Sequence, residues 1–286
     1  EERAQELLRP FGFSAVTFPD CTGTAAENIR AFHSRQVHQD FVLTDRPGVV
    51  MGQRYTPIAR VGVCVPRSPE AFPSTILMNV IPARIAGVEE IVVVTPPDPA
   101  GRISDEALAA AKIAGADRIF KIGGAQAVAA LAYGTESVPA VDKIVGPGGI
   151  YVATAKRKVF GKVGIDMIAG PSEICIVADA SGDPAFIAAD MLSQAEHDEK
   201  AACILLTDSE RLADEAEKEI KKQAEILDRA EIVRKSLENY GTILIAGSID
   251  ECIDISNAVA PEHLELCVRD AEKAANKIRC AGSVFV

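Results

Sequence analysis

The chain has 286 residues, of which 48% are hydrophobic and 25% are charged, an ordinary globular composition with enough apolar material for a sizeable core. Thirty Lys and Arg residues against 41 Asp and Glu residues give a formal net charge of −11, which argues against binding to nucleic-acid backbones. No apolar run approaches the length of a membrane span, and no signal pattern precedes the first expected helix. We therefore expect a soluble, cytoplasmic protein.

Residues 1–60 are the least regular part of the sequence. Residues 24–33 have a helical pattern, and residues 34–60 are expected to form an extended arm with turns.

From residue 61 the chain alternates apolar strands with helical stretches. The β-branched run from Ile91 to Val94 is typical of a strand buried on both faces of a parallel sheet. Repeated βα units predict such a sheet, with right-handed crossovers. The expected strands are 61–65, 90–95, 117–122 and 143–146, and the expected helices are 74–87, 104–114, 124–133 and 149–160.

The alternation restarts at residue 173, so we expect two α/β domains of similar architecture. Asp183 is a predicted N-cap, with Pro184 at the first helical position. Residues 209–239 are highly charged, and we interpret them as helix with a solvated face. The expected strands are 173–177, 203–207, 241–246, 263–268 and 283–286, and the other expected helices are 249–259 and 270–279. Helical spacing places Ile187, Met191 and Ala195 on one face, and Leu212, Ala216 and Ile220 on another.

Seven cysteines occur, and none belongs to a CxxC pair. Several lie in strand-like apolar runs, such as those around Cys64 and Cys175. We interpret them as buried thiols in a reducing compartment, in preference to a disulfide framework.

The segment Gln194-Ala195-Glu196-His197 lies near the C-terminal end of an expected helix. Positions i and i+3 share a helix face, so Gln194 and His197 can converge on one point. An imidazole nitrogen is a common Zn²⁺ ligand and an amide oxygen an uncommon one. Spacing alone favours the plainer interpretation, in which both residues are solvated at a helix end.

The segment Pro261-Glu262-His263 lies between an expected helix and a strand. Pro261 discourages helical geometry at Ala260, so the helix should end there. Glu262 and His263 then fall at the edge of a parallel sheet, where α/β sites are built. A carboxylate beside an imidazole can activate water and act as a general base, whereas the plainer interpretation is two surface residues.

Three glycine-rich turns follow expected strands. They are Gly123-Gly124-Ala125-Gln126, Gly146-Pro147-Gly148-Gly149 and Gly170-Pro171-Ser172-Glu173. The first two open helices, whose first N–H groups can hold a phosphate. None fits G-x-G-x-x-G, so tight turns are an equal alternative. No P-loop and no G-x-S-x-G motif occurs.

Taken together, these stretches resemble the histidinol dehydrogenase family in an ordered set over residues 25–286. The matching segments are Ala26-Glu27-Asn28-Ile29-Arg30-Ala31-Phe32-His33, Gly123-Gly124-Ala125-Gln126-Ala127, Tyr133-Gly134-Thr135-Glu136-Ser137-Val138-Pro139, Val141-Asp142-Lys143-Ile144, Gly170-Pro171-Ser172-Glu173, Ser193-Gln194-Ala195-Glu196-His197 and Pro261-Glu262-His263-Leu264.

The resemblance implies an α/β fold with two Rossmann-like parallel-sheet domains, one inserted into the other. The inserted domain, on the NAD side, would be residues 61–171. The outer domain, with the metal and catalytic motifs, would combine residues 1–60 and 172–286. The family is a zinc-dependent cytoplasmic homodimer that oxidises L-histidinol to L-histidine in two NAD⁺-dependent steps of histidine biosynthesis.

The resemblance also implies residue roles. Gln194 and His197 would be zinc ligands that also touch the substrate, and Ser172 would contact the substrate. Glu262 would activate the water that attacks the aldehyde intermediate. His263 would bind the substrate and act as the general base.

On the cofactor side, the resemblance implies that Gln126 contacts NAD. Two further positions depart from the family pattern, because Cys64 replaces a tyrosine and Gly149 replaces an asparagine. Arg67-Ser68 stands where the family has Gly-Gly.

Family members also continue past the strand that ends here at Val286. That further part supplies an aspartate zinc ligand and, from the partner subunit, a glutamate and a histidine. The sequence therefore predicts an incomplete metal site. Two alternatives stay open: a shortened relative that binds a small ligand or a partner without catalysis, and a dehydrogenase of another amino or hydroxy alcohol. The last strand would leave a sheet edge that tends to pair with another chain, so we expect a homo-oligomer.

Overall fold

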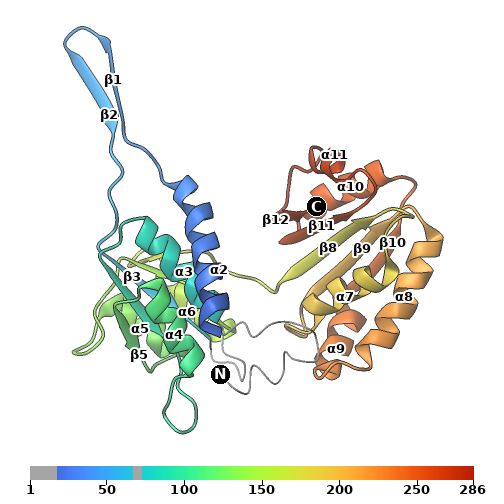
Figure 1. Cartoon of the computed structure of the whole chain (residues 1–286), viewed down its shortest axis with the longest axis horizontal. Helices are drawn as coiled ribbons and strands as arrows, with labels where there is room; N and C mark the ends of the chain where they lie inside the picture. Colours follow the sequence, from blue (N-terminus) through green and yellow to red (C-terminus); the bar gives the residue numbers. More distant parts are fainter. Residues whose placement is uncertain (1–17, 67–72) are drawn as a thin grey trace. The chain divides into compact units, whose positions relative to one another are not determined.

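The computed structural model describes residues 18–66 and 73–286, and it divides into two compact units between Ala169 and Gly170. Each unit contains one parallel sheet with helices on both faces (Figure 1). In the described part of the chain, none of the helices combines the length and apolarity that crossing a bilayer requires.

The sheet of the first unit has five parallel strands in the order β5-β4-β3-β6-β7. The first strand in the chain, β3, is central, and later strands add on one side and then on the other. The strands are β3 Arg60–Cys64, β4 Glu90–Val94, β5 Arg118–Phe120, β6 Lys143–Val145 and β7 Gly164–Ile165, and the helices between them are α3 Pro73–Ile85, α4 Asp105–Ala114, α5 Gly124–Tyr133 and α6 Ile150–Val159.

The second unit repeats this topology, with β8 central and the order β10-β9-β8-β11-β12. The α/β fold with two Rossmann-like parallel sheets is therefore confirmed. The strands are β8 Glu173–Ala178, β9 Ala202–Thr207, β10 Gly241–Ile245, β11 His263–Cys267 and β12 Ser283–Phe285, and the helices are α7 Pro184–Ala195, α8 Glu210–Ala224, α9 Ala230–Tyr240, α10 Ile249–Val259 and α11 Ala271–Ala275.

The strand β4 shows why the central strands are apolar at every position. Ile91 and Val93 belong to the core beneath α3 and α4, whereas Val92 and Val94 belong to the core beneath α5. All four side chains are buried, as the continuous β-branched run predicted.

The helix α2 (Phe18–His33) packs against α3 and α4 of the first unit. Ala26 is fully buried in their core, and Arg30 Nη2 donates a hydrogen bond to Ile113 O at 2.9 Å. The assignment of residues 1–60 to an outer domain stays a prediction.

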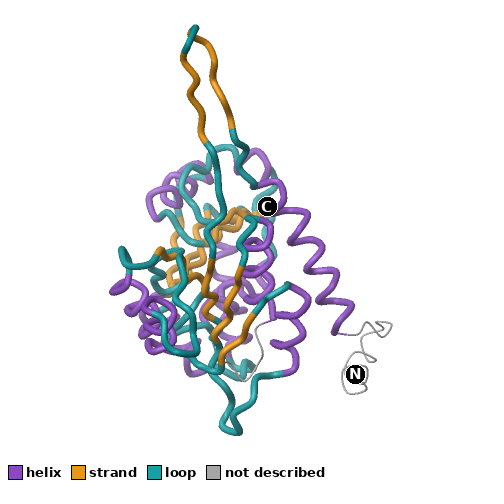
Figure 2. Tube along the Cα trace, turned by 90° about the vertical axis from the view of Figure 1, so that its left-hand side faces the viewer, coloured by secondary structure: helices purple, strands orange, loops and turns teal. Residues whose placement is uncertain are grey.

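Residues 34–60 are more regular than the expected arm. After a short 3-10 helix, η2 (Ser34–Gln36), the strands β1 (Phe41–Arg46) and β2 (Val49–Gln53) form an antiparallel hairpin that stands clear of its own unit (Figure 2). Gly48 has a φ of 78°, which a residue with a side chain rarely adopts, and it follows Pro47 in the turn. The Pro-Gly pair between two apolar runs is the sequence feature that indicates a hairpin here.

The charged stretch 209–239 is helical, as expected, but it forms two helices, α8 and α9, and the break between them was not predicted. An unbroken helix of that length would extend about 45 Å, more than twice the roughly 20 Å of a six-residue strand. The chain therefore breaks so that both pieces can pack on the sheet. The apolar stripe predicted on this stretch, formed by Leu212, Ala216 and Ile220, is buried, as are Ile187, Met191 and Ala195 on α7.

The two-residue strand β7 was not predicted, because it has no apolar run.

The six cysteines whose side chains the structure describes are free thiols, and Cys64, Cys175, Cys203 and Cys252 are buried. The interpretation as buried thiols is confirmed for these four. Cys267 is half-buried and Cys280 is exposed.

Candidate functional site

Helix α7 positions the Gln194 motif in the second unit. Asp183 caps the helix by accepting the Ala185 N–H at 2.8 Å, with Pro184 in the first turn, as predicted. The helix ends at Ala195, and His197 lies just beyond it with its N–H bonded to Gln194 O at 3.1 Å. Gln194 is only 6% exposed, and its Nε2 is a buried polar atom without a hydrogen-bond partner.

A left-handed turn positions the Glu262 motif. Helix α10 ends at Val259, as Pro261 predicted, and Ala260 follows with a φ of 54°. A non-glycine residue there costs about 1–2 kcal/mol. After the turn, Glu262 O accepts the Ser283 N–H at 2.9 Å, so the start of β12 holds the Glu262 backbone in place.

All five motif residues of the second unit gather at the amino ends of its strands. In register, His263 pairs with Ile174 of β8, so β8 and β11 begin at the same edge. Helix α7 runs back from the carboxyl end of β8, so its last turn returns to that edge, where the N–H at the start of β9 bonds to Ser172 O at 3.1 Å. Glu262 and His263 thus lie at an edge of the sheet, as predicted, but this is the amino edge. Ligands of doubly wound sheets normally bind at the carboxyl edge. The residues brought together are Ser172, Gln194, His197, Glu262 and His263.

The hydrogen bonds of His263 define which ring nitrogen can act as a base. Its Nδ1 lies 3.1 Å from the backbone oxygen of Glu173. A carbonyl oxygen only accepts, so Nδ1 carries the proton and the neutral ring has its lone pair at Nε2. Glu262 Oε2 accepts the Glu173 N–H at 3.3 Å and lies 3.9 Å from His263 Nδ1. The two side chains are 35% and 51% exposed, so a small molecule can reach both.

A carboxyl pair lies next to these residues. Glu265 follows His263 by two positions on one face of β11, and it hydrogen-bonds to Asp190, one turn before Gln194 on α7. Burial raises the pKa of Glu265 to about 7, and the nearby charge of Asp190 adds to this shift. A protonated Glu265 can donate to Asp190, which connects α7 to β11.

The donor set is suited to zinc in type but not in number. Gln194 and His197 supply an amide and an imidazole, and a zinc site has four ligands. Over residues 18–66 and 73–286, no group of three or more His, Cys, Asp or Glu side chains is placed to hold a metal. The described residues therefore leave the coordination shell incomplete.

In the first unit, two of the three predicted cofactor residues line a crevice of about 280 Å³ at the carboxyl edge, and Gln126 is not among its lining residues. It lies between β3 and β6, where the strand order reverses, and Cys64 and Gly149 line it. Helices α5 and α6 begin there without a side-chain cap, so their first N–H groups are available to an anion. Gln126 lies in the first turn of α5, and its side-chain amide lies beside Gly124. Arg67 and Ser68 lie outside the described residues.

A buried ion pair holds the turn at Gly146, next to the crevice residues Pro147–Gly149. Lys156 is 4% exposed, forms an ion pair with Asp166 and donates to Gly146 O at 3.0 Å. Asp166 in turn accepts the Gly146 N–H at 2.8 Å. Burial raises the pKa of the Cys64 thiol to about 12, so this sulfur is protonated at neutral pH.

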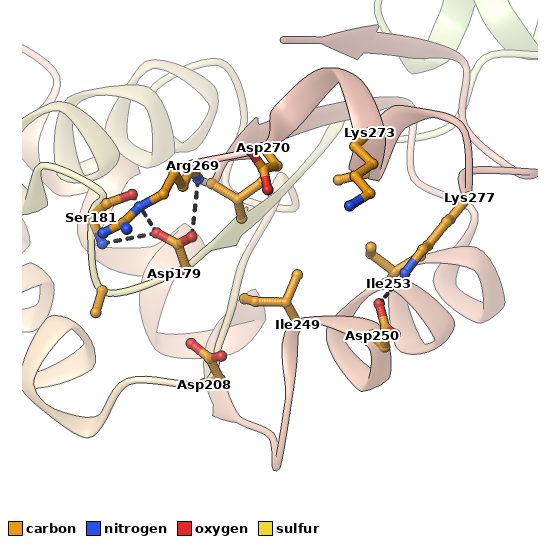
Figure 3. Close-up of a pocket in the computed structure, with 13 residues that line it drawn as sticks. Asp179, Ser181, Asp208, Ile249, Asp250, Ile253, Arg269, Asp270, Lys273 and Lys277 are labelled. Atoms are coloured by element: carbon orange, nitrogen blue, oxygen red, sulfur yellow. Dashed lines mark hydrogen bonds and ion pairs between the residues drawn. The ribbon is translucent and has the colours of Figure 1, made fainter.

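The corresponding crevice of the second unit is different (Figure 3). It measures about 470 Å³ and is lined by acidic and basic side chains. Asp179 accepts N–H groups from Arg269 and Ser181, and Lys277 pairs with Asp250. Carboxylates at the strand ends repel a pyrophosphate, and no residue singled out in the sequence lies here. The carboxylates are Asp179, Asp208, Asp250 and Asp270, and the cations are Arg269, Lys273 and Lys277.

Sequence reasoning missed three parts of these sites. The backbone of Glu173 orients both Glu262 and His263, and backbone groups leave no sequence signal. The Asp190–Glu265 and Lys156–Asp166 pairs join distant segments. The one sequence feature that indicates a role for Glu265 is its position, a charged residue between two leucines of an apolar strand.

Comparison with known proteins gives a consistent result. The family model described as histidinol dehydrogenase matches residues 17–286. The chain is 53% identical over 262 residues to histidinol dehydrogenase of Geobacter metallireducens, covering 92% of this chain and 60% of that protein. It is 50% identical over 282 residues to the enzyme of Bacillus thuringiensis, covering 99% and 66%. The chain thus spans about three fifths to two thirds of the length of these relatives.

Solved structures agree. The crystal structure of histidinol dehydrogenase from Elizabethkingia anophelis superimposes with a TM-score of 0.87 at 40% identity, covering 91% of this chain and 60% of that one. An acetylating aldehyde dehydrogenase from Geobacillus thermoglucosidasius, at 17% identity and a TM-score of 0.56, shares the fold alone. With this extent of identity over nearly all of its length, the chain belongs to the histidinol dehydrogenase family.

Proposed function

We propose that this chain carries the NAD-binding and base-bearing parts of a histidinol dehydrogenase, which oxidises L-histidinol to L-histidine in two NAD⁺-dependent steps. The observation that carries the proposal is the orientation of His263, whose Nδ1–H is bonded to Glu173 O and whose Nε2 is free. Family membership supplies the reaction, and this geometry supplies a base at the motif that the family shares.

In the first step, His263 Nε2 accepts the proton of the substrate hydroxyl group. As that O–H bond breaks, a C=O bond forms and the carbon loses a hydride. Bound NAD⁺ supplies the hydride acceptor in both steps. The product of this step is an aldehyde.

In the second step, water adds to the aldehyde. Glu262 has one carboxylate oxygen on the Glu173 N–H, and the other is free to accept a proton from the water. His263 then accepts the hydroxyl proton of the hydrate as the second hydride leaves. In sum, one alcohol, one water and two NAD⁺ give one carboxylate, two NADH and three protons.

The remaining assignments concern binding. Ser172, Gln194 and His197 would hold the substrate at the amino edge of the second sheet. Gln126 and the N–H groups at Gly149 would hold NAD in the first-unit crevice, which Cys64 lines. Zinc would bind Gln194 and His197, but since two donors do not complete its shell, no step above passes through the metal. A cytoplasmic homodimer completes the proposal.

The test is NADH formation by the purified chain with L-histidinol, NAD⁺ and Zn²⁺. Two NADH per substrate are expected, and a His263→Asn variant should form NADH at least about 10²-fold more slowly. A panel of other amino and hydroxy alcohols distinguishes a histidinol enzyme from a relative with another substrate. No NADH above background would contradict catalysis by this chain.

A second candidate, binding without catalysis, is favoured by the incomplete donor set of the described residues. Calorimetry separates the two. Binding of NAD⁺ and L-histidinol without turnover would support the second candidate and overturn the first.

A further inference from the structure

A buried lysine on α6 takes no part in the proposed reaction. Lys156 is 4% exposed, and its Nζ forms an ion pair with Asp166 and donates to Gly146 O at 3.0 Å. Taking an ammonium group out of water is costly, and well-packed apolar residues in place of a buried ion pair are often equally stable. Stability alone therefore does not account for a lysine at this position.

The pair holds both backbone polar groups of one residue. Asp166 Oδ2 accepts the Gly146 N–H at 2.8 Å, and Lys156 donates to the Gly146 oxygen. The other oxygen of Asp166 accepts the Met167 N–H at 2.7 Å, and the Asp166 N–H bonds to Ile144 O at 3.2 Å. The carboxylate is thus itself fixed beside the end of β6. As a result, the peptide groups on both sides of Gly146 have a defined orientation.

Gly146 is a position where the chain changes direction. It follows β6 with a φ of 102°, in the region that favours glycine. It also packs so closely on the Cys64 backbone oxygen that no side chain would fit. A glycine has many conformations of similar energy, and the two charged side chains select one of them. The selected conformation leads the chain from the sheet into the crevice.

The residues that follow Gly146 line the crevice. They are Pro147, Gly148 and Gly149, and α6 begins after them without a side-chain cap. Gly148 packs directly on Val152, which leaves no room for a side chain between the turn and the helix. Because the two are in contact, the orientation of Gly146 sets the direction of the free N–H groups at the helix start. These N–H groups are the proposed site of the NAD pyrophosphate.

Lys156 belongs to the same helix as these N–H groups. Side chains on a helix point toward its N-terminus, and Lys156 reaches back along α6 to Gly146, ten residues earlier. This bond fixes the turn and the helix relative to each other. The charges of Lys156 and Asp166 cancel, so the pair affects a bound anion through the orientation of the turn and not through its own charge.

We propose that Lys156 and Asp166 are positioning residues for the cofactor. By orienting Gly146, they hold residues 146–149 and the start of α6 in the conformation that binds NAD. Neither residue lines the crevice, so both act through the backbone. The inference rests on the proposed function, because it requires that NAD binds in this crevice. Loss of the pair should weaken NAD binding and leave the binding of L-histidinol, which involves residues of the second unit, unchanged.

The first experiment is calorimetry of the full chain with NAD⁺. Lys156→Met should raise the Kd for NAD⁺ at least about tenfold, because the turn loses its orientation. The matched control is Lys158→Met, the same substitution at an exposed position of the same helix, which should stay within about twofold. L-Histidinol with Zn²⁺, titrated separately, should have the same Kd in all three proteins. A purely structural role would lower the free energy of unfolding and leave the Kd of the folded protein for NAD⁺ unchanged.

The second experiment separates orientation from stability with the double variant Lys156→Met/Asp166→Leu. No charge is left buried without its partner, so its free energy of unfolding should exceed that of Lys156→Met. Both side-chain bonds to Gly146 are still missing, so its affinity for NAD⁺ should remain at least about tenfold below that of wild type. Circular dichroism shows which variants are folded, and the double variant decides the question if Lys156→Met does not fold.

Three results would overturn the inference while wild type still binds NAD⁺. They are an unchanged Kd for NAD⁺ in Lys156→Met, wild-type affinity in the double variant, and equal losses of affinity for NAD⁺ and L-histidinol. The proposed function would stand in each case. A wild type that does not bind NAD⁺ would instead contradict the proposed function, and the inference with it.

Discussion

The two units share one strand order, yet their candidate sites lie at opposite edges of their sheets. In the first unit, the crevice lies at the carboxyl edge, between glycine-rich turns and uncapped helix starts. In the second unit, the corresponding crevice contains four carboxylates, and the motif residues lie at the amino edge. The shared topology therefore does not determine where the functional residues lie. The side chains at the strand ends decide which edge of the sheet can accept an anion.

The largest expected effect is at the amino edge of the second sheet. His263→Asn removes the proposed base, so kcat should fall by about 10²–10⁴. Lys273→Ala, at the opposite edge of the same sheet, is the control and should stay within about twofold, which is under 0.5 kcal/mol. Steady-state NADH formation measures both. Equal losses in the two variants would contradict the separation of the edges.

The buried cation of the first unit should matter most for stability. Lys156→Met leaves Asp166 without its partner and frees the Gly146 backbone, so the free energy of unfolding should fall by about 3 kcal/mol. Lys222→Met breaks an exposed pair with Glu219 and should cost at most about 1 kcal/mol. Urea unfolding gives both values, and similar losses would mean that the buried pair has no special role.

The glycine-lined crevice should be sensitive to charge. Gly149→Asp puts a carboxylate at the start of α6, where the pyrophosphate would bind, so NAD⁺ affinity should fall about tenfold, or 1.4 kcal/mol. Gly23→Asp on α2 also enters open space and serves as the control. Calorimetry with NAD⁺ compares them. Unchanged affinity at position 149 would place the cofactor elsewhere.

The smallest effect is a pH dependence at the carboxyl pair of the second unit. The folded-state pKa of Glu265 is raised from 4.5 to about 7, so the folded state holds this proton more tightly than the unfolded chain. Its contribution is complete below pH 4.5 and is lost as pH rises through 7. Because Glu265 is half-exposed, we expect wild type to lose only about 1 kcal/mol of unfolding free energy between pH 5 and 8.5 relative to Glu265→Gln. Parallel curves for the two proteins would contradict a shared proton.

Much of the fold could be predicted from the sequence, because its signals are local. The apolar run of β4, the Asp183 cap and the Pro261 stop each act within a few residues, and the structure has all three where expected. The hairpin and the break between α8 and α9 were missed. The apolar pattern of residues 41–53 fits an extended arm as well as a hairpin. The charged pattern of residues 209–239 fits one helix as well as two, and packing on the sheet decides between these.

The candidate site could be predicted in its residues but not in its geometry. Glu262 and His263 can be identified in the sequence because of the turn before them. The edge of the sheet at which they lie depends on the strand register, and the motif does not predict that register. The tautomer of His263 depends on the backbone of Glu173, a residue 90 positions away. Contacts of that range arise only when the sheet is assembled.

The burial of the thiols affects how the protein reacts with oxidants. Peroxide reacts with thiolates, and burial raises the pKa of Cys64 and Cys175 to about 12 and of Cys203 to about 11. At neutral pH these sulfurs are almost wholly protonated and shielded from solvent. Cys64, which lines the crevice of the first unit, is therefore not an easily oxidised sulfur. Within the described residues, damage by peroxide should begin at the exposed Cys280, far along the chain from the glycine turns.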